Sequence, residues 1–157
     1  MDRGLIMIKK YSNKRPRWRL LAGYERDLSW AEYSRVRSGL APSGPEDKWL
    51  IYRRGQTVYF RRSGNGTLVY KVRFAPEGGS FRAVEAHLNV GPGQLDPMPE
   101  PLERRMLDYL IDRLLLGHSA GFPVSESVDS EQAAVIERIW MGRAAGLSAH
   151  PGQDSRL

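Results

Sequence analysis

The run from Lys48 to Phe74 constrains the fold of this chain more than any other segment. It reads KWLIYRRGQTVYFRRSGNGTLVYKVRF and holds seven cationic residues and no acidic one. The tetrapeptide Ser63-Gly64-Asn65-Gly66 lies between two strand-like runs, and Asn and Gly tolerate the positive φ angles that a tight hairpin needs. The run therefore predicts consecutive antiparallel strands that carry a positive charge.

Four strands are expected, at about residues 48–54, 57–62, 67–74 and 81–90. In the third strand every second residue is apolar, which is the period of a half-buried strand. The fourth strand follows the same rule, with one set of side chains facing the core and the other facing outward. We expect Val84, Ala86 and Leu88 to point inward and Glu85, His87 and Asn89 to point outward. The prediction is a four-stranded antiparallel meander.

Helices are expected before and after these strands. Residues 28–38 form a short N-terminal helix, and residues 102–116 carry apolar side chains at spacings of three and four. A third helix begins at Asp129, where Gln132 completes a capping box, and its apolar stripe comprises Val135, Ile136, Ile139 and Trp140. Helices that follow a run of strands indicate an α+β domain whose sheet is covered on one face by the 102–116 helix.

The length of 157 residues and the 41% hydrophobic content suit a single domain with one modest core. We expect a basic N-terminal arm at residues 1–26, a single α+β domain at residues 27–146 and a flexible tail at residues 147–157. Met7 is an alternative start to Met1. The absence of cysteine excludes disulfides and thiolate metal sites. Because no apolar run is long enough for a signal peptide or a membrane span, we expect a cytoplasmic protein without membrane association.

The net charge of +6 is unevenly distributed along the chain. Residues 1–26 carry +6 and residues 48–76 carry +7, whereas residues 27–47 carry −2 and residues 77–157 carry −5. An anionic partner would therefore meet the arm and the strand region first. The alternative is a protein whose charges mostly pair with one another.

One face of the predicted sheet is the candidate binding surface. If Val58, Phe60 and Val72 point to the core, the opposite surface carries Tyr59, Arg61, Lys71, Arg73, Glu85 and His87. Interleaved aromatic and basic side chains suit single-stranded nucleic acid, because bases stack on rings while cations follow the phosphates. The candidate ligand-binding residues are Tyr59, Arg61, Arg62, Lys71 and Arg73. The alternative is that these cations pair with Glu85 across the strands or are covered by the N-terminal arm.

Several short motifs together resemble a known protein family. They are Asp47-Lys48-Trp49, Ile51-Tyr52, Tyr59-Phe60, Arg62-Ser63, Tyr70 with Val72 and Phe74, Leu110-Ile111, Leu114-Leu115-Leu116-Gly117 and Phe122-Pro123. In this order and spacing, over about residues 47–124, they resemble a family of small bacterial proteins of unknown function. Their pattern runs W-x-I-Y, Y-F-x-R-S, Y-x-V, L-I-x-x-L-L-L-G and F-P.

The resemblance implies no established activity, although some such segments accompany macro-type proteins that handle ADP-ribose. Where the family tends to have His-Arg-Ser-Trp-Thr-Gly, this chain has Arg61-Arg62-Ser63-Gly64-Asn65-Gly66. Either a ligand site at this turn has changed, or the glycines simply make a better turn.

Catalytic and metal-binding patterns are sparse. Glu85 and His87 lie two residues apart on one strand face and are the weak candidates for a catalytic base with its orienting carboxylate, but no nucleophile completes the set. Asp108 and Asp112 share a helical face with Arg104 and Arg105, so surface ion pairs are expected there. The spacing of the histidines predicts no metal site, and no cofactor motif is present.

Three functions remain open from the sequence. The favoured one is a non-enzymatic domain that binds an anionic partner, which could be a nucleotide, a nucleic acid or an acidic protein. The second is a protein–protein interaction or regulatory module that uses the apolar face of the 129–145 helix, with an undetermined oligomeric state. The third is an enzyme that acts on a phosphorylated or ADP-ribosylated substrate through Glu85, His87 and Arg62.

Overall fold

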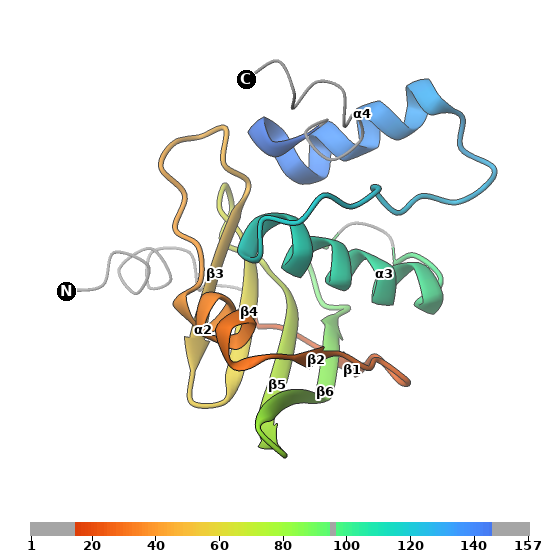
Figure 1. The fold of residues 1–157 in the computed structure, drawn as a ribbon. Coiled ribbons are helices and arrows are strands. Elements are labelled where there is room, and N and C mark those ends of the chain that lie inside the picture. The colour runs from red at the N-terminus through yellow and green to blue at the C-terminus, as the bar shows by residue number, and fades with distance from the viewer. Residues whose placement is uncertain (1–14, 95–96, 146–157) are drawn as a thin grey trace.

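An antiparallel sheet with helices on one face forms the body of the computed structural model, which describes residues 15–94 and 97–145 (Figure 1). The expected α+β class is confirmed. The predicted extreme N-terminal arm up to residue 14, the alternative start at Met7 and the tail at residues 147–157 lie outside the described residues. Within the described ranges, no helix is both long and apolar enough to cross a lipid bilayer.

The predicted meander is present as four consecutive strands. They are β3 (Trp49–Arg54), β4 (Thr57–Arg62), β5 (Leu68–Glu77) and β6 (Ser80–Asn89). The turn between β4 and β5 closes as its sequence predicts: Gly66 has a φ of 71°, and its amide donates to the carbonyl of Arg62. The side chain of Asn65 then accepts a hydrogen bond from the amide of Thr67 at 3.0 Å. Gly66 therefore supplies the positive φ angle of the turn, and Asn65 supplies a side-chain hydrogen bond to its backbone.

The sheet is larger than the predicted one because two short strands extend it. These strands, β1 (Trp18–Leu20) and β2 (Asp27–Leu28), both pair with β6, and the sheet is six-stranded with the order β1-β6-β5-β4-β3 and β2 beside β6. The prediction of four strands was therefore wrong in number. Strands of two and three residues are too short to show a period of two, and β1 lies in a segment assigned to the basic arm.

The short helix near the N-terminus, α2 (Trp30–Ser38), begins two residues later than residue 28. Ser29 is its N-cap and forms a reciprocal capping box with Glu32, which explains why the helix starts there. Tyr33 stacks on Phe81 with 3.8 Å between ring centroids and meets Phe74 edge-on. The helix therefore packs on the core side of β5 and β6.

The two long helices follow the strands. Helix α3 (Glu100–Leu110) continues into a π-helical turn (Ile111–Leu115), and α4 (Ser130–Met141) continues into a 3-10 turn (Gly142–Ala144). The predicted capping box of Asp129 and Gln132 is present at the start of α4. Only part of the predicted apolar stripe is buried, because Val135 and Ile139 are 60% and 52% exposed while Trp140 is packed inward.

The core lies between the sheet and these helices (Figure 1). Val58, Phe60, Tyr70 and Val72 from the strands meet Leu107 of α3 in it, and each is completely or almost completely buried. Trp49 lies below α4, where its indole stacks on Trp140 at 5.9 Å and donates a 2.7 Å hydrogen bond to the Trp140 carbonyl. A single core therefore joins the meander to α3 and α4.

Two bulges interrupt the alternation of side chains along β5 and β6. The pairing register shifts between Phe60 and Arg61, and again between Arg73 and Phe74. As a result Ala83 rather than Val84 faces the core, and Val84 is 43% exposed. Asn89, expected to point outward into solvent, is buried, and its side chain donates to the carbonyl of Leu68 at 2.8 Å. The predicted orientations of Ala86 and Leu88 are confirmed by their burial.

A charged cluster fastens the segment between β1 and β2 to α3. Arg26 donates to Asp112 at 2.7 Å and to Asp108 at 3.3 Å, while the hydroxyl of Tyr24 donates to Asp108 at 2.7 Å. Burial, followed by the charge of Asp108, raises the pKa of Tyr24, so this hydroxyl keeps its proton. The expected pairing of both carboxylates with Arg104 and Arg105 was wrong, because Arg26 reaches them from a segment more than 80 residues away.

We expect Asp112→Asn to lower the free energy of unfolding by about 1–2 kcal/mol, because it leaves the half-buried Arg26 with one carboxylate partner fewer. Urea unfolding measures this change. Glu85→Gln is the matched control: it removes the same charge from the exposed Arg73–Glu85 pair, and we expect a loss below about 0.5 kcal/mol. Equal effects of the two substitutions would contradict the assignment of Arg26 as a structural clamp.

Candidate functional site

The sheet face opposite the helices gathers most of the predicted binding residues. In the register, Lys71 of β5 pairs with Tyr59 of β4 and with His87 of β6, and Arg73 pairs with Glu85. Directly paired residues of adjacent strands point to the same side of a sheet. We call this side the open face, because the helices of the described part of the chain lie on the other side of the sheet (Figure 1). It comprises Trp18, Tyr52, Arg54, Tyr59, Arg61, Lys71, Arg73, Glu85 and His87.

Three aromatic rings are distributed across the open face, and cations lie next to two of them. The ammonium group of Lys71 lies over the ring of Trp18 on β1, 4.7 Å from the ring centroid. Tyr52 on β3 stacks against Tyr59 on β4, with 5.3 Å between centroids and an interplanar angle of 16°. The guanidinium group of Arg54 lies 5.9 Å from the Tyr52 ring. These rings are half-buried, so each keeps part of its surface accessible.

Arg61 belongs to the open face by register, but it is not a free surface cation. Its side chain is 6% exposed. Its guanidinium group donates to the Tyr52 hydroxyl at 3.1 Å and to the carbonyl of Gly66 in the hairpin turn. Arg61 therefore fixes the turn and the Tyr52 ring in place, and it offers much less of its charge to a partner than Lys71 or Arg73.

The structure separates Arg62 from the other predicted binding residues. Arg62 pairs with Trp49, and its guanidinium group lies over the Trp49 ring at 4.9 Å, on the helix side of the sheet. Its terminal nitrogens donate to the carbonyls of Ile139 and Trp140 at 2.8 Å each, at the C-terminal end of α4. Burial lowers the pKa of this guanidinium group from its usual value. Arg61 and Arg62 are adjacent in the sequence but lie on opposite faces of the sheet.

The Glu85 and His87 pair has no catalytic geometry in the described contacts. The carboxylate of Glu85 faces Arg73 at 3.6 Å, and no hydrogen bond joins it to the His87 ring. Burial lowers the pKa of His87, and the nearby charge of Lys71 lowers it further. His87 is therefore neutral at pH 7 and lacks the orienting carboxylate that a general base needs.

The sequence-based prediction of this face omitted Trp18, Tyr52 and Arg54. Tyr52 and Arg54 could have been found, because pairing across the β3–β4 hairpin places Tyr52 opposite Tyr59 and Arg54 opposite Thr57. Trp18 could not, because it reaches the face only through the pairing of β1 with β6, which no local pattern signals. Among the described residues, no group of three or more His, Asp or Glu side chains is placed to hold a metal ion.

Comparison of the chain with models of known protein families, with curated proteins and with solved structures finds no match. The resemblance to a family of small bacterial proteins therefore stays a prediction.

We expect Arg61→Gln to destabilise the fold by about 1–3 kcal/mol, because it removes the buried guanidinium group that donates to the Gly66 carbonyl and the Tyr52 hydroxyl. Lys71→Gln is the matched control on the same face, and its half-exposed ammonium group should contribute less than about 0.5 kcal/mol. Thermal and urea unfolding of the two variants measure the difference. If Arg61→Gln left the free energy of unfolding unchanged, Arg61 would be a surface cation rather than a structural one.

Proposed function

We propose that this protein is a binding domain that holds single-stranded nucleic acid on the open face. The observation that carries the proposal is the alternation of accessible aromatic rings and cations on a sheet surface that no described helix covers. Bases stack on such rings whatever their identity, while lysine and arginine follow the phosphates. The binding would therefore depend more on single-strandedness than on sequence.

The spacing of the rings suits a short stretch of nucleotides. Trp18 and Tyr59 lie on β1 and β4, which are separated by β6 and β5 in the sheet order. Neighbouring strands are about 4.8 Å apart, so the two rings are about 14 Å apart across the sheet. A four-stranded surface of this width stacks about two or three bases in other proteins.

The charge of the open face favours an anion. Lys71, Arg73 and Arg54 are half-buried or exposed cations there, and Glu85 is the acidic side chain that the register places among them. The exposed Arg73–Glu85 pair is weak in water, so a phosphate can replace the carboxylate as the partner of Arg73 at little cost. Lys71 is held over the Trp18 ring, which places a positive charge beside a stacking surface.

We expect the double variant Lys71→Glu/Arg73→Glu to weaken the binding of a labelled single-stranded oligonucleotide of about ten residues by at least tenfold. The slope of log affinity against log salt, which is negative, should also become shallower by about 1.4, because two phosphate contacts are lost. Fluorescence anisotropy at several salt concentrations measures both quantities, and circular dichroism checks the fold.

The matched control is Arg105→Glu/Arg138→Glu, which makes the same change in charge on exposed residues of α3 and α4. It should bind almost as tightly as the unchanged protein. If the two double variants lost the same affinity, net charge alone would explain the weaker binding and the proposed site would be overturned. Tighter binding of duplex than of single strands would also contradict it.

We expect the affinity for the same oligonucleotide to rise as the pH falls from about 7 to about 5.5. Burial and Lys71 hold the pKa of His87 below its usual 6.5, whereas a bound phosphate would raise it, so binding takes up a proton in this range. Lys71 and Glu85 are the charged groups beside His87, and Leu20 of β1 faces it without a charge. His87→Gln should remove this pH dependence in anisotropy titrations while leaving the affinity at pH 8 unchanged. A pH dependence that persists in the variant would place the titrating group elsewhere.

A further inference from the structure

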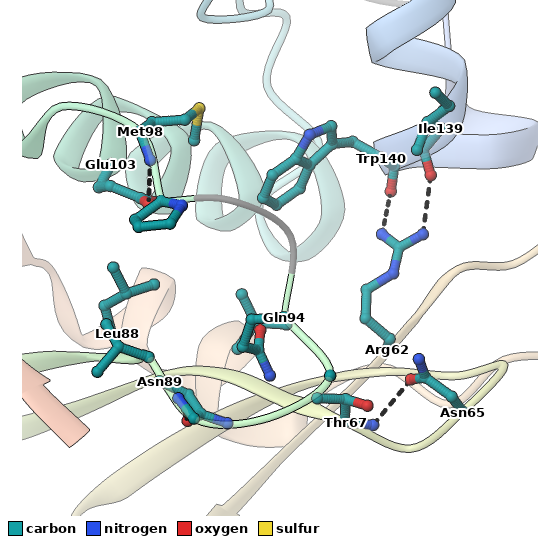
Figure 2. Close-up of a pocket in the computed structure, with 15 residues that line it drawn as sticks. Arg62, Asn65, Thr67, Leu88, Asn89, Gln94, Met98, Glu103, Ile139 and Trp140 are labelled. Atoms are coloured by element: carbon teal, nitrogen blue, oxygen red, sulfur yellow. Dashed lines mark hydrogen bonds between the residues drawn. The ribbon is translucent and has the colours of Figure 1, made fainter. Parts of the chain in front are cut away.

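A cavity of about 380 Å³ lies on the helix side of the sheet, away from the open face. It opens where the β4–β5 hairpin and the segment after β6 meet the start of α3 and the end of α4 (Figure 2). Ligand cavities in proteins start at roughly 300 Å³. The space is therefore large enough for a small organic molecule.

The walls of this cavity are mainly apolar. Val69, Leu88, Met98, Ile139 and Trp140 line it. Figure 2 shows the Trp140 indole pointing toward the middle of the cavity. Its stacking on Trp49 at 5.9 Å holds the indole in place, so the ring is a fixed surface against which a planar ligand can pack.

Among the described residues, the charged side chains that line the cavity are Arg62 and Glu103, and both are engaged by the protein. The guanidinium group of Arg62 donates to the two carbonyls at the end of α4 (Figure 2). Glu103 is 3% exposed and accepts hydrogen bonds from the Tyr70 hydroxyl and, at 3.1 Å, from the Met98 amide. The charges are opposite in sign and already have partners, so the cavity favours a neutral ligand.

Uncharged hydrogen-bonding groups remain available on the hairpin side. The Thr67 hydroxyl has no partner in the described contacts, and Asn65 uses its side-chain oxygen for the Thr67 amide, which leaves the nitrogen of the carboxamide free. Thr67 and Asn65 lie next to Arg62 at one end of the cavity (Figure 2). A ligand therefore meets an aromatic wall and a short polar edge.

We propose that this cavity binds a neutral, planar heteroaromatic compound of about nucleoside size. Its ring packs against Trp140, and its polar edge bonds to Thr67 and Asn65. This site is separate from the open face in location and in chemistry, because the open face favours phosphate and the cavity does not. The two proposals therefore stand or fall independently.

Calorimetric titration with adenosine and with AMP tests the proposal, since these probes differ by one phosphate. We expect adenosine to bind at least tenfold more tightly than AMP, and indole to bind more tightly than indole-3-acetate for the same reason. In ¹H–¹⁵N and methyl NMR spectra, adenosine should shift the signals of Val69, Leu88 and the Trp140 indole. Shifts confined to Trp18 and Tyr59 would assign the binding to the open face and overturn the proposal.

Thr67→Val removes the hydroxyl at nearly constant volume and should weaken adenosine binding by about tenfold. The matched control is Thr57→Val on the open face, where Thr57 pairs with Arg73, and it should leave adenosine binding unchanged. If Thr67→Val does not fold, the NMR shifts in the unchanged protein decide the question. The proposal fails if AMP binds as well as adenosine, if the two threonine variants behave alike, or if the unchanged protein binds none of adenosine, uridine and indole at millimolar concentration.

Discussion

The division of β5 between two faces is the constraint on which the rest of the structure depends. Tyr70 and Val72 enter the core, whereas Lys71 and Arg73, which alternate with them along the strand, face the other way. A shift of the register by one residue would bury these two cations under the helices and expose the aromatic core. The hydrophobic core and the basic surface are therefore consequences of the same alternation, and neither could be moved without the other.

The local part of this arrangement could be predicted from the sequence. The strands, the hairpin and the capping box at Asp129 follow from patterns that lie within a few residues, and they hold in the structure. The bulges could not be predicted, because an extra residue in one strand becomes visible only against its partner strand. One of them places Val84 on the surface where a strict period of two puts it in the core.

The remaining features depend on contacts between distant segments. Arg26 meets Asp112 across 86 positions, and Trp18 reaches the open face through a three-residue strand. Arg62 looks equivalent to Arg61 in the sequence, yet it lies on the helix side because α4 returns to that edge of the sheet. Composition alone does not distinguish the cations of this region, whereas the tertiary packing separates the buried Arg61 from the exposed Arg73.

The β4–β5 hairpin links the two candidate sites physically. Arg61 fixes the turn from the open side through Gly66, while Arg62 ties the same strand end to α4, and Asn65 and Thr67 of the turn line the cavity. An occupant of the cavity would therefore rest on the same turn that positions Tyr52 through Arg61. Because each arginine is held by backbone carbonyls, the turn is a rigid support for both faces.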